Sequence, residues 1–435
     1  MKFHRLVILS AMVAALCSSC RSGDFAKVAD GRFIGKDVTP YYIGANFWYG
    51  AILASDSRGG QPDRLVSELD NLKSLGVTNL RILVGADGLD GVPTRVEPTL
   101  QKEPGVYDEA ILKGLDKLLV ELGKRGMKAV LYLNNSWEWS GGYGMYLEWA
   151  GEGKAPIPAE IGYSEYMNRV SRFVVSDKAK ELFADHVRFI VGRTNSVTGK
   201  PYKEDPAIFS WQIGNEPRCF SSDPQVKQAF ADWMWASAAL IKSIDPNHMV
   251  SSGSEGLWGC ENDPELFELI HSCPYIDYIN IHIWPYNWGW AKPESLMEDI
   301  PYAIEQTDAY IDAHLAVAEK YHKPIVIEEF GFPRDGFKFS KETTTKARDA
   351  YYSHVFERVI QSASEGGLIA GVNFWAWGGL ASQAPDHDNW IPGDDYCGDP
   401  AQEAQGLNSV YFGDTTIDVI KNATAAIDAT LRSAK

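Results

Sequence analysis

Helical and extended patterns of apolar residues alternate along most of the chain. In residues 65–75 leucines and a valine recur at helical spacing, and residues 79–84 follow as a short apolar run typical of a buried strand. The same unit recurs in residues 112–125 and 128–134, where Gly126 ends the predicted helix. Strands that alternate with helices in this way predict parallel pairing within one sheet.

Later units extend this pattern to eight strands. Further helices are predicted at residues 179–191, 226–244, 303–321 and 345–365, and further strands at residues 42–47, 208–214, 249–253, 278–282, 325–329 and 371–375. Eight strands joined by helices indicate an α/β fold, a (β/α)8 TIM barrel, whose active site lies in the loops after the strands. Two long segments, 137–163 and 383–405, also follow strands, so we expect both to wall the site.

A chain of 435 residues fits one such barrel, and no break in composition suggests a second domain. The catalytic domain is expected to span residues 37–435. Before it, a basic start and an apolar run over residues 6–16 are typical of an export signal, since the run is too short to span a bilayer. The run ends in Ser-Ser-Cys at Cys20.

This ending resembles the processing site of bacterial lipoproteins, in which Cys20 would become the lipid-modified first residue. Residues 1–19 are then a signal peptide and residues 20–36 a tether. The alternative is an ordinary signal peptide cut near Ser19, with Cys20 unmodified. Both readings place the protein outside the cytoplasm, either as a cell-envelope lipoprotein or as a secreted protein.

Charge and composition limit the classes of molecule that the protein is expected to bind. The formal net charge of -17 disfavours nucleic acid, anionic lipid headgroups and acidic polymers, and a neutral polymer fits better. The 14 Trp, 20 Tyr and 18 Phe residues can fill a core and still leave rings on which sugars stack. Four cysteines follow the export signal, namely Cys219, Cys260, Cys273 and Cys397. They allow three pairings, of which Cys260 with Cys273 would close a short loop, and their spacing does not favour zinc.

Two glutamates, far apart in the sequence, each end an apolar run. Glu216 lies in Asn-Glu-Pro after residues 208–214, and Glu329 precedes Phe-Gly at the end of residues 325–329. Two carboxyl groups at matching strand ends can cleave a glycosidic bond, because one donates a proton to the leaving oxygen while the other attacks the sugar carbon. Either glutamate alone would more often be a solvated residue or a helix cap, so the pair carries this hypothesis.

Segments around these glutamates resemble glycoside hydrolase family 5, and specifically its endo-β-1,4-mannanase branch. The matching segments are residues 43–49, 79–82, 131–142, 215–218, 282–285, 329–331 and 373–379. The block Asn-Ser-Trp-Glu-Trp-Ser-Gly-Gly at residues 135–142 and the arginine after Asn-Glu-Pro are what narrow the resemblance to mannanases. The reaction of this family requires no metal and no organic cofactor, so none is expected.

The resemblance implies that Glu216 is the acid/base residue and Glu329 the nucleophile, at the separation of about 5 Å that retaining hydrolysis needs. Because successive strand residues point to opposite faces, only one of Glu328 and Glu329 is expected inside the barrel, and Glu328 is expected to face a helix. Arg81 lies within an apolar strand, where burial requires an anionic partner, and the resemblance implies that this partner is the nucleophile.

Other site residues are also implied by the resemblance. Asn215 would form a hydrogen bond to the sugar 2-hydroxyl. The alternative is that it only forms the turn after the strand. His282 would form hydrogen bonds beside the two glutamates. The alternative is that it is a histidine of the core with no catalytic role. The Trp375 ring would form the floor of the cleavage subsite by stacking on the sugar. The alternative is that it packs in the core. Arg218 would reach the sugar beyond the leaving unit.

One position departs from the wider family. Many members carry a tyrosine two residues after this histidine, whereas this chain has Trp284. Either Trp284 or Tyr286 could supply the missing hydrogen bond to the nucleophile. The candidate cleft aromatics are Trp48, Trp137, Trp284, Trp288 and Trp377.

The leading hypothesis is an exported, lipid-anchored, monomeric enzyme that hydrolyses β-1,4 linkages within mannan, glucomannan or galactomannan and retains configuration. An endo-β-1,4-glucanase on the same scaffold is the alternative enzyme. A non-catalytic surface barrel that binds glycans is the alternative from another class, and the presence of both glutamates disfavours it.

Overall fold

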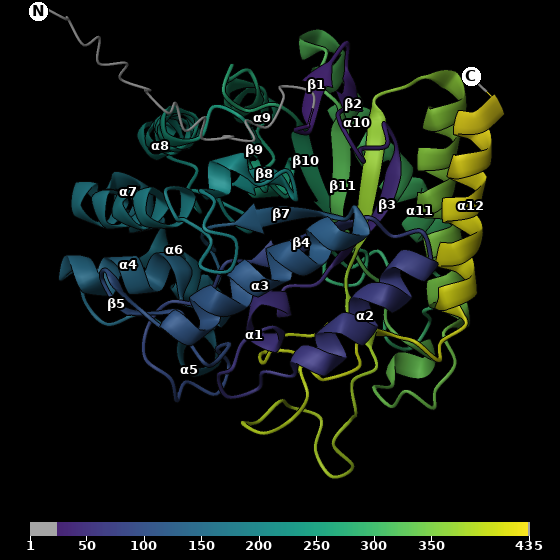
Figure 1. The fold of residues 1–435 in the computed structure, drawn as a ribbon, viewed down its shortest axis with the longest axis horizontal. Helices are drawn as coiled ribbons and strands as arrows, with labels where there is room; N and C mark the ends of the chain where they lie inside the picture. Colours follow the sequence, from purple (N-terminus) through teal and green to yellow (C-terminus); the bar gives the residue numbers. More distant parts are fainter. Residues whose placement is uncertain (1–23, 434–435) are drawn as a thin grey trace, which may run out of the picture.

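The computed structural model describes residues 24–433. Eight parallel strands form its central sheet, in the order β10-β11-β12-β3-β4-β7-β8-β9, and a parallel bridge between Ser251 and Tyr278 joins the two ends of this order (Figure 1). The strands are β3 (Tyr42–Asn46), β4 (Asn79–Leu83), β7 (Lys128–Tyr132), β8 (Ile208–Gln212), β9 (Met249–Ser251), β10 (Ile279–Ile283), β11 (Ile325–Phe330) and β12 (Ile369–Phe374). The predicted barrel is therefore confirmed.

A helix follows each barrel strand before the next one begins. The main helices are α2 (Pro62–Ser74), α3 (Glu109–Arg125), α7 (Asp177–Val191), α8 (Pro224–Ile244), α9 (Pro264–His271), α10 (Ile300–Tyr321), α11 (Lys346–Glu365) and α12 (Thr416–Ser433). Local signals set their limits: the Asp108 side chain accepts from two backbone N–H groups at the start of α3, and Gly126 ends that helix with φ 65°. The sequence pattern missed α9 and α12. α12 is amphipathic and packs along α11 at the outside of the barrel (Figure 1).

Short elements build the loops around the barrel. The short helices are α1 (Gly50–Leu53), α4 (Gly142–Ala150), α5 (Pro158–Ile161), α6 (Tyr163–Val170), η1 (Glu138–Ser140), η2 (Ser171–Val175), η3 (Tyr202–Glu204), η4 (Trp258–Cys260) and η5 (Asp335–Phe337). The short strands pair as β5 (Gln101–Glu103) with β6 (Val106–Tyr107), and β13 (Trp377–Gly379) with β14 (Val410–Tyr411). All of these except η3, which directly precedes β8, follow a barrel strand and enlarge the end of the barrel at which the strands finish.

The other end of the barrel is closed by a segment expected to be a tether. Strands β1 (Lys27–Ala29) and β2 (Arg32–Ile34) form an antiparallel hairpin. Phe33 is buried, and its ring meets Phe209 at 4.9 Å and Tyr278 at 5.4 Å, both edge to face. The tether prediction is therefore wrong for residues 24–36, because these apolar side chains cover the barrel floor. The predicted signal peptide and Cys20 lie outside the described residues.

The cysteines also differ from expectation. Cys219, Cys260, Cys273 and Cys397 are all buried and free within the described chain. The pairing of Cys260 with Cys273 is therefore not formed, and both residues pack in the apolar core. The thiols of Cys219 and Cys397 donate to oxygen atoms of Ser221 at 3.5 Å and Gln405 at 3.1 Å. Across residues 24–433, no helix combines the length and the apolar character that crossing a bilayer requires.

Candidate active site

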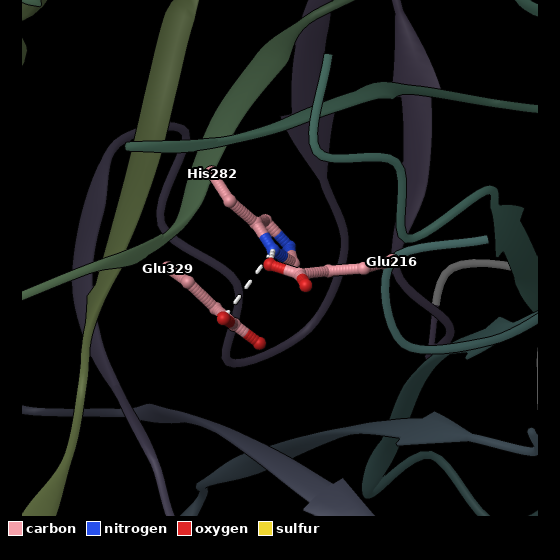
Figure 2. Close-up of side chains that lie close together, drawn as sticks. All are labelled: Glu216, His282 and Glu329. Atoms are coloured by element: carbon pink, nitrogen blue, oxygen red, sulfur yellow. Dashed lines mark hydrogen bonds and ion pairs between the residues drawn. The ribbon is translucent and has the colours of Figure 1, made fainter. Parts of the chain in front are cut away.

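Three residues from different strands meet at the end of the barrel where the strands finish. Glu216 follows β8, His282 lies on β10 and Glu329 lies on β11 (Figure 2). Nδ1 of His282 is 2.8 Å from Oε1 of Glu216 and 3.3 Å from Oε2 of Glu329. Carboxylate oxygens of the two glutamates lie within 4.8 Å of each other. This spacing suits a retaining glycosidase, since inverting enzymes separate their carboxyl groups by about 6.5–9.5 Å.

Arg81 organises the nucleophile side of this group. Its buried guanidinium donates a short hydrogen bond to Oε1 of Glu329, and other bonds reach Gln212 at 2.8 Å and Asn215 at 2.8 Å. The guanidinium also lies over the Tyr132 ring at 4.4 Å. Arg81 thus contacts the predicted nucleophile, and Asn215 lies beside Arg81. The bond of Asn215 to a sugar stays a prediction.

Glu328 is also inside the barrel, against expectation. Its side chain is fully buried, accepts a short hydrogen bond from Gln212 and lies 3.8 Å from Arg81. The reason is a bulge: Ile327 pairs with Ile281, but the next pair joins Glu329 to His282, so Glu328 is the extra residue. The bulge interrupts strict alternation, and both carboxyl groups face the barrel interior.

The two candidate catalytic carboxyl groups have opposite surroundings. Burial raises the pKa of Glu329 well above its usual range, Arg81 opposes this effect, and the Glu216 charge adds to it. Burial also acts on Glu216, but hydrogen bonds from His282 and Trp137 outweigh it and lower its pKa. Burial lowers the pKa of His282 to about 4, so the ring is neutral. Such close carboxyl groups titrate as a pair. These directions favour the proton on Glu329, whereas the roles implied by the family place it on Glu216. The Arg81 guanidinium bound to Glu329 is the contact that favours an ionised Glu329.

A cation would fit this group poorly. Glu216, His282 and Glu329 are close enough to ligate one. However, Arg81 already holds one oxygen of Glu329, and Trp137 donates to Oε2 of Glu216 at 2.5 Å. The adjacent guanidinium would also repel a cation. The donors around these carboxyl groups therefore suit proton transfer rather than metal binding.

The backbone at the acid/base position is held from both sides. Glu216 has φ 48°, an uncommon conformation for a residue with a side chain. Its N–H donates to Gly253 at 3.0 Å, and its carbonyl accepts a short hydrogen bond from Ser136. Neighbouring loops therefore fix the direction in which the Glu216 side chain leaves the strand end.

A cleft of about 760 Å³ opens over the two glutamates. Trp375 lies in its wall and is nearly buried, with Trp139 and Trp284 edge-on to its ring at 6.3 and 5.9 Å. Nε1 of Trp375 has no partner among the described residues. The predicted cleft residues Trp137, Trp284, Trp288, Trp375 and Arg218 all line this space.

Two predicted cleft aromatics belong to the core instead. Trp48 is buried and donates to the carbonyl of Gly398 at 2.8 Å. Trp377 is fully buried and donates to Glu68 at 2.9 Å. Neither lines the cleft. Their predicted substrate contacts are therefore wrong, because both indoles turn toward surrounding loops and helix α2.

Neither candidate replaces the tyrosine hydroxyl of the wider family. Within residues 24–433, Glu329 receives no hydrogen bond from Trp284 or Tyr286. The Trp284 ring meets Trp375, and the Tyr286 ring packs on Phe337 at 4.8 Å. Arg81 and His282 are the cationic and neutral donors that remain beside the nucleophile.

Several cleft residues were not predicted from the sequence. Arg218 is 3.5 Å from Glu255, a buried residue whose pKa rises to about 8 because of burial and the nearby Glu216 charge. Glu403 also lines the cleft, burial raises its pKa to about 8, and its Oε2 has no partner among the described residues. Both come from long loops, and only their position after barrel strands could have indicated them. The remaining unpredicted lining residues include Glu138, Trp139, Tyr163 and Trp258.

Both insertions reach this cleft, as expected. Residues 137–163 contribute Trp137, Glu138 and Tyr163, while residues 383–405 contribute Gln402 and Glu403. Tyr163 of the first loop and Glu403 of the second thus line the same cleft. The cleft is therefore walled by segments that are far apart in the sequence.

Comparison with known proteins agrees with this geometry. A family model described as GH family 5 beta-mannosidase-like matches residues 23–432. The chain belongs to glycoside hydrolase family 5. A putative mannan endo-1,4-beta-mannosidase 9 of Oryza sativa is 32% identical over 404 residues, covering 89% of this chain and 90% of the relative. Mannan endo-1,4-beta-mannosidase 1 of Arabidopsis thaliana is 29% identical and covers 83% of each chain.

Solved structures extend the comparison. The family 5 mannosidase of Rhizomucor miehei has a TM-score of 0.86 and 34% identity, covering 95% of this chain and 100% of that one. An endo-1,4-beta-mannanase from the same organism has a TM-score of 0.66 and 22% identity, covering 94% and 99%. At that identity the second similarity supports the fold alone. The predicted family and barrel are confirmed, and the chain is a glycoside hydrolase.

Proposed function

We propose that this enzyme hydrolyses internal β-1,4 linkages of mannan, glucomannan or galactomannan and retains the anomeric configuration. The observation that carries the proposal is the pair of carboxyl groups within 4.8 Å, bridged by His282, with Arg81 bound to one of them. The similarity to plant proteins named mannan endo-1,4-beta-mannosidases supports β-1,4-mannan as the substrate. The cleft also offers rings and a low density of positive charge, which suits a neutral polysaccharide.

The proposed reaction has two steps, formation and hydrolysis of a covalent intermediate on Glu329. In the first, an oxygen of Glu329 bonds the anomeric carbon, the glycosidic bond breaks, and the proton of Glu216 moves to the leaving oxygen. In the second, water bonds the same carbon, the ester bond to Glu329 breaks, and Glu216 takes the proton from water. Arg81 stabilises Glu329 while Glu329 is ionised. Asn215, which accepts a hydrogen bond from Arg81, would bond the sugar 2-hydroxyl.

Substrate comparison tests the proposal. Reducing-sugar release should be highest on mannan or glucomannan and low on cellulose and xylan. NMR of the product early in the reaction should show the β anomer. Cellulose as the best substrate would support the alternative endo-glucanase, and an α anomer as the first product would contradict the retaining mechanism.

A second candidate is the release of single sugars from a chain end. It is favoured by the high similarity to the solved Rhizomucor miehei mannosidase, at a TM-score of 0.86. Products from mannohexaose labelled at its reducing end decide between the two. Early appearance of several internal fragments supports the endo-acting enzyme, whereas mannose and labelled mannopentaose alone support the exo-acting one.

We also propose that the chain is exported and anchored as a lipoprotein through Cys20, and that it acts as a monomer. The support is the basic start, the apolar run over residues 6–16 and Ser-Ser-Cys at its end. The full-length protein should partition with membranes and carry acyl mass, and Cys20→Ala should release it. Soluble, unacylated protein cut after Cys20 would instead support simple secretion.

A further inference from the structure

Trp137 lies beside the acid/base residue as well as in the cleft wall. It follows β7, and its Nε1 is 2.5 Å from Oε2 of Glu216. Tyr166 stacks near its ring at 6.2 Å and 18°, and Phe220 meets the ring edge-on at 5.3 Å. These neighbours hold the indole in one plane, so its N–H remains directed at the carboxylate.

This contact restricts where the proton on Glu216 can lie. An indole nitrogen only donates, so Oε2 must accept whenever the bond is present. The other oxygen, Oε1, is 2.8 Å from Nδ1 of the neutral His282. When Nδ1 carries the imidazole proton, both Glu216 oxygens accept hydrogen bonds, which favours the ionised carboxylate.

A hydrogen bond of this kind strengthens as its acceptor becomes charged. Glu216 gains negative charge while it gives its proton to the leaving oxygen, and it must be ionised when water is activated. The Trp137 N–H is therefore matched to the charged form that develops in one step and is required in the next.

We propose that Trp137 is a positioning residue that acts through Glu216, making it a stronger acid and holding Oε2 toward the cleft. The proposal rests on the proposed function, because that function assigns the acid/base role to Glu216. It differs from sugar stacking, which was the role expected for this ring. Stacking alone would alter substrate affinity and leave the titration of Glu216 unchanged.

The test is the pH dependence of kcat/KM for mannohexaose in Trp137→Phe. Phenylalanine keeps a ring between Tyr166 and Phe220 but lacks the N–H. The upper limb, set by loss of the Glu216 proton, should move to higher pH by about one unit, because a hydrogen bond to a charged group is lost. Trp139→Phe is the matched control, since Trp139 lines the same cleft and contacts Trp375. Its upper limb should stay at the wild-type pH.

A second variant separates the N–H from the shape of the ring. Benzothienylalanine at position 137 replaces the indole N–H with sulfur and keeps the bicyclic ring. The same upward shift is expected, with KM close to the wild-type value. An unmoved upper limb in this variant, or an equal shift in Trp139→Phe, would overturn the proposal. Absence of wild-type activity on any β-mannan would instead overturn the proposed function, and this inference with it.

Discussion

Aromatic rings are abundant at both ends of the barrel, but the two ends use them differently. At the floor, Phe33 of the β1–β2 hairpin packs edge to face on Phe209 and Tyr278, and the Tyr278 hydroxyl lies 2.7 Å from that of Ser210. These rings contact one another within one buried cluster. The floor contributes to stability through burial, and its rings do not line the cleft.

At the cleft, rings stand beside carboxyl groups and retain unused polar atoms. Nε1 of Trp375 and Oε2 of Glu403 have no partner among the described residues, although both line the cleft. Because both residues line the cleft, a molecule bound there can complete their hydrogen bonding. The comparison teaches that one end was organised for packing and the other for binding, and the following predictions separate the two.

The largest effect is expected from the nucleophile. Glu329→Ala should lower kcat by at least about 10⁴-fold, since the proposed covalent intermediate forms on this carboxyl group. A fluorosugar inactivator should label Glu329, which peptide mass spectrometry would locate. Glu216→Ala should retain activity on substrates with good leaving groups and regain more with azide. A label on Glu328, which also faces the interior, would contradict the assignment.

The floor should behave in the opposite way. Phe33→Ala removes a fully buried ring, and we expect the free energy of unfolding to fall by about 3–5 kcal/mol with kcat/KM unchanged in the folded protein. Denaturant unfolding and steady-state kinetics measure the two quantities. As a control, Tyr163→Ala at the cleft should change kinetics with little loss of stability, since Tyr163 is 56% exposed. A change in kcat/KM in Phe33→Ala together with a large loss of stability in Tyr163→Ala would contradict the distinction between a stabilising floor and a binding cleft.

Low pH should lower the stability of the protein through protonation of His314, which lies beside the cleft. Nε2 of this buried histidine accepts from the Leu257 N–H at 2.8 Å, beside the cleft residue Trp258, and Nδ1 donates to the carbonyl of Tyr310 at 2.6 Å. Burial lowers the pKa of His314 to about 4. The unfolded chain, with a pKa of about 6.5, therefore binds a proton that the folded chain does not, and stability falls as pH decreases from about 6.5 to 4.

At pH 5 this histidine should cost about 2 kcal/mol relative to pH 7. Urea unfolding at both pH values measures the difference. His314→Gln keeps a donor and an acceptor but does not titrate, so its loss of stability between pH 7 and pH 5 should be smaller by that amount. An identical loss in both proteins would exclude His314 as the source.

The smallest effect is expected at Arg218. Arg218→Ala should lower kcat/KM on short manno-oligosaccharides by about tenfold, the equivalent of one modest contact, and less on long polymer held by other contacts. Glu261→Gln is the control, because it removes the 3.3 Å ion pair but leaves the arginine in the cleft. Equal losses on all chain lengths would indicate that Arg218 only supports Glu255.

Much of this architecture follows from local patterns. Apolar residues at helical or strand spacing, with Gly126 as a helix limit, predict six helices and the strands of the barrel. The positions of Glu216 and Glu329 at strand ends follow from the same pattern, because every strand of a parallel barrel finishes at one end. The motifs around them were sufficient to predict the family.

The remaining features depend on contacts between distant segments. The bulge that turns both Glu328 and Glu329 inward arises from the pairing of β11 with β10, which alternation within one strand cannot reveal. The same holds for Trp48 and Trp377, whose polar atoms found partners in the core, and for Trp137, whose partner is Glu216. An apolar or aromatic residue type predicts that a side chain is buried, but only the tertiary structure decides which neighbours bury it.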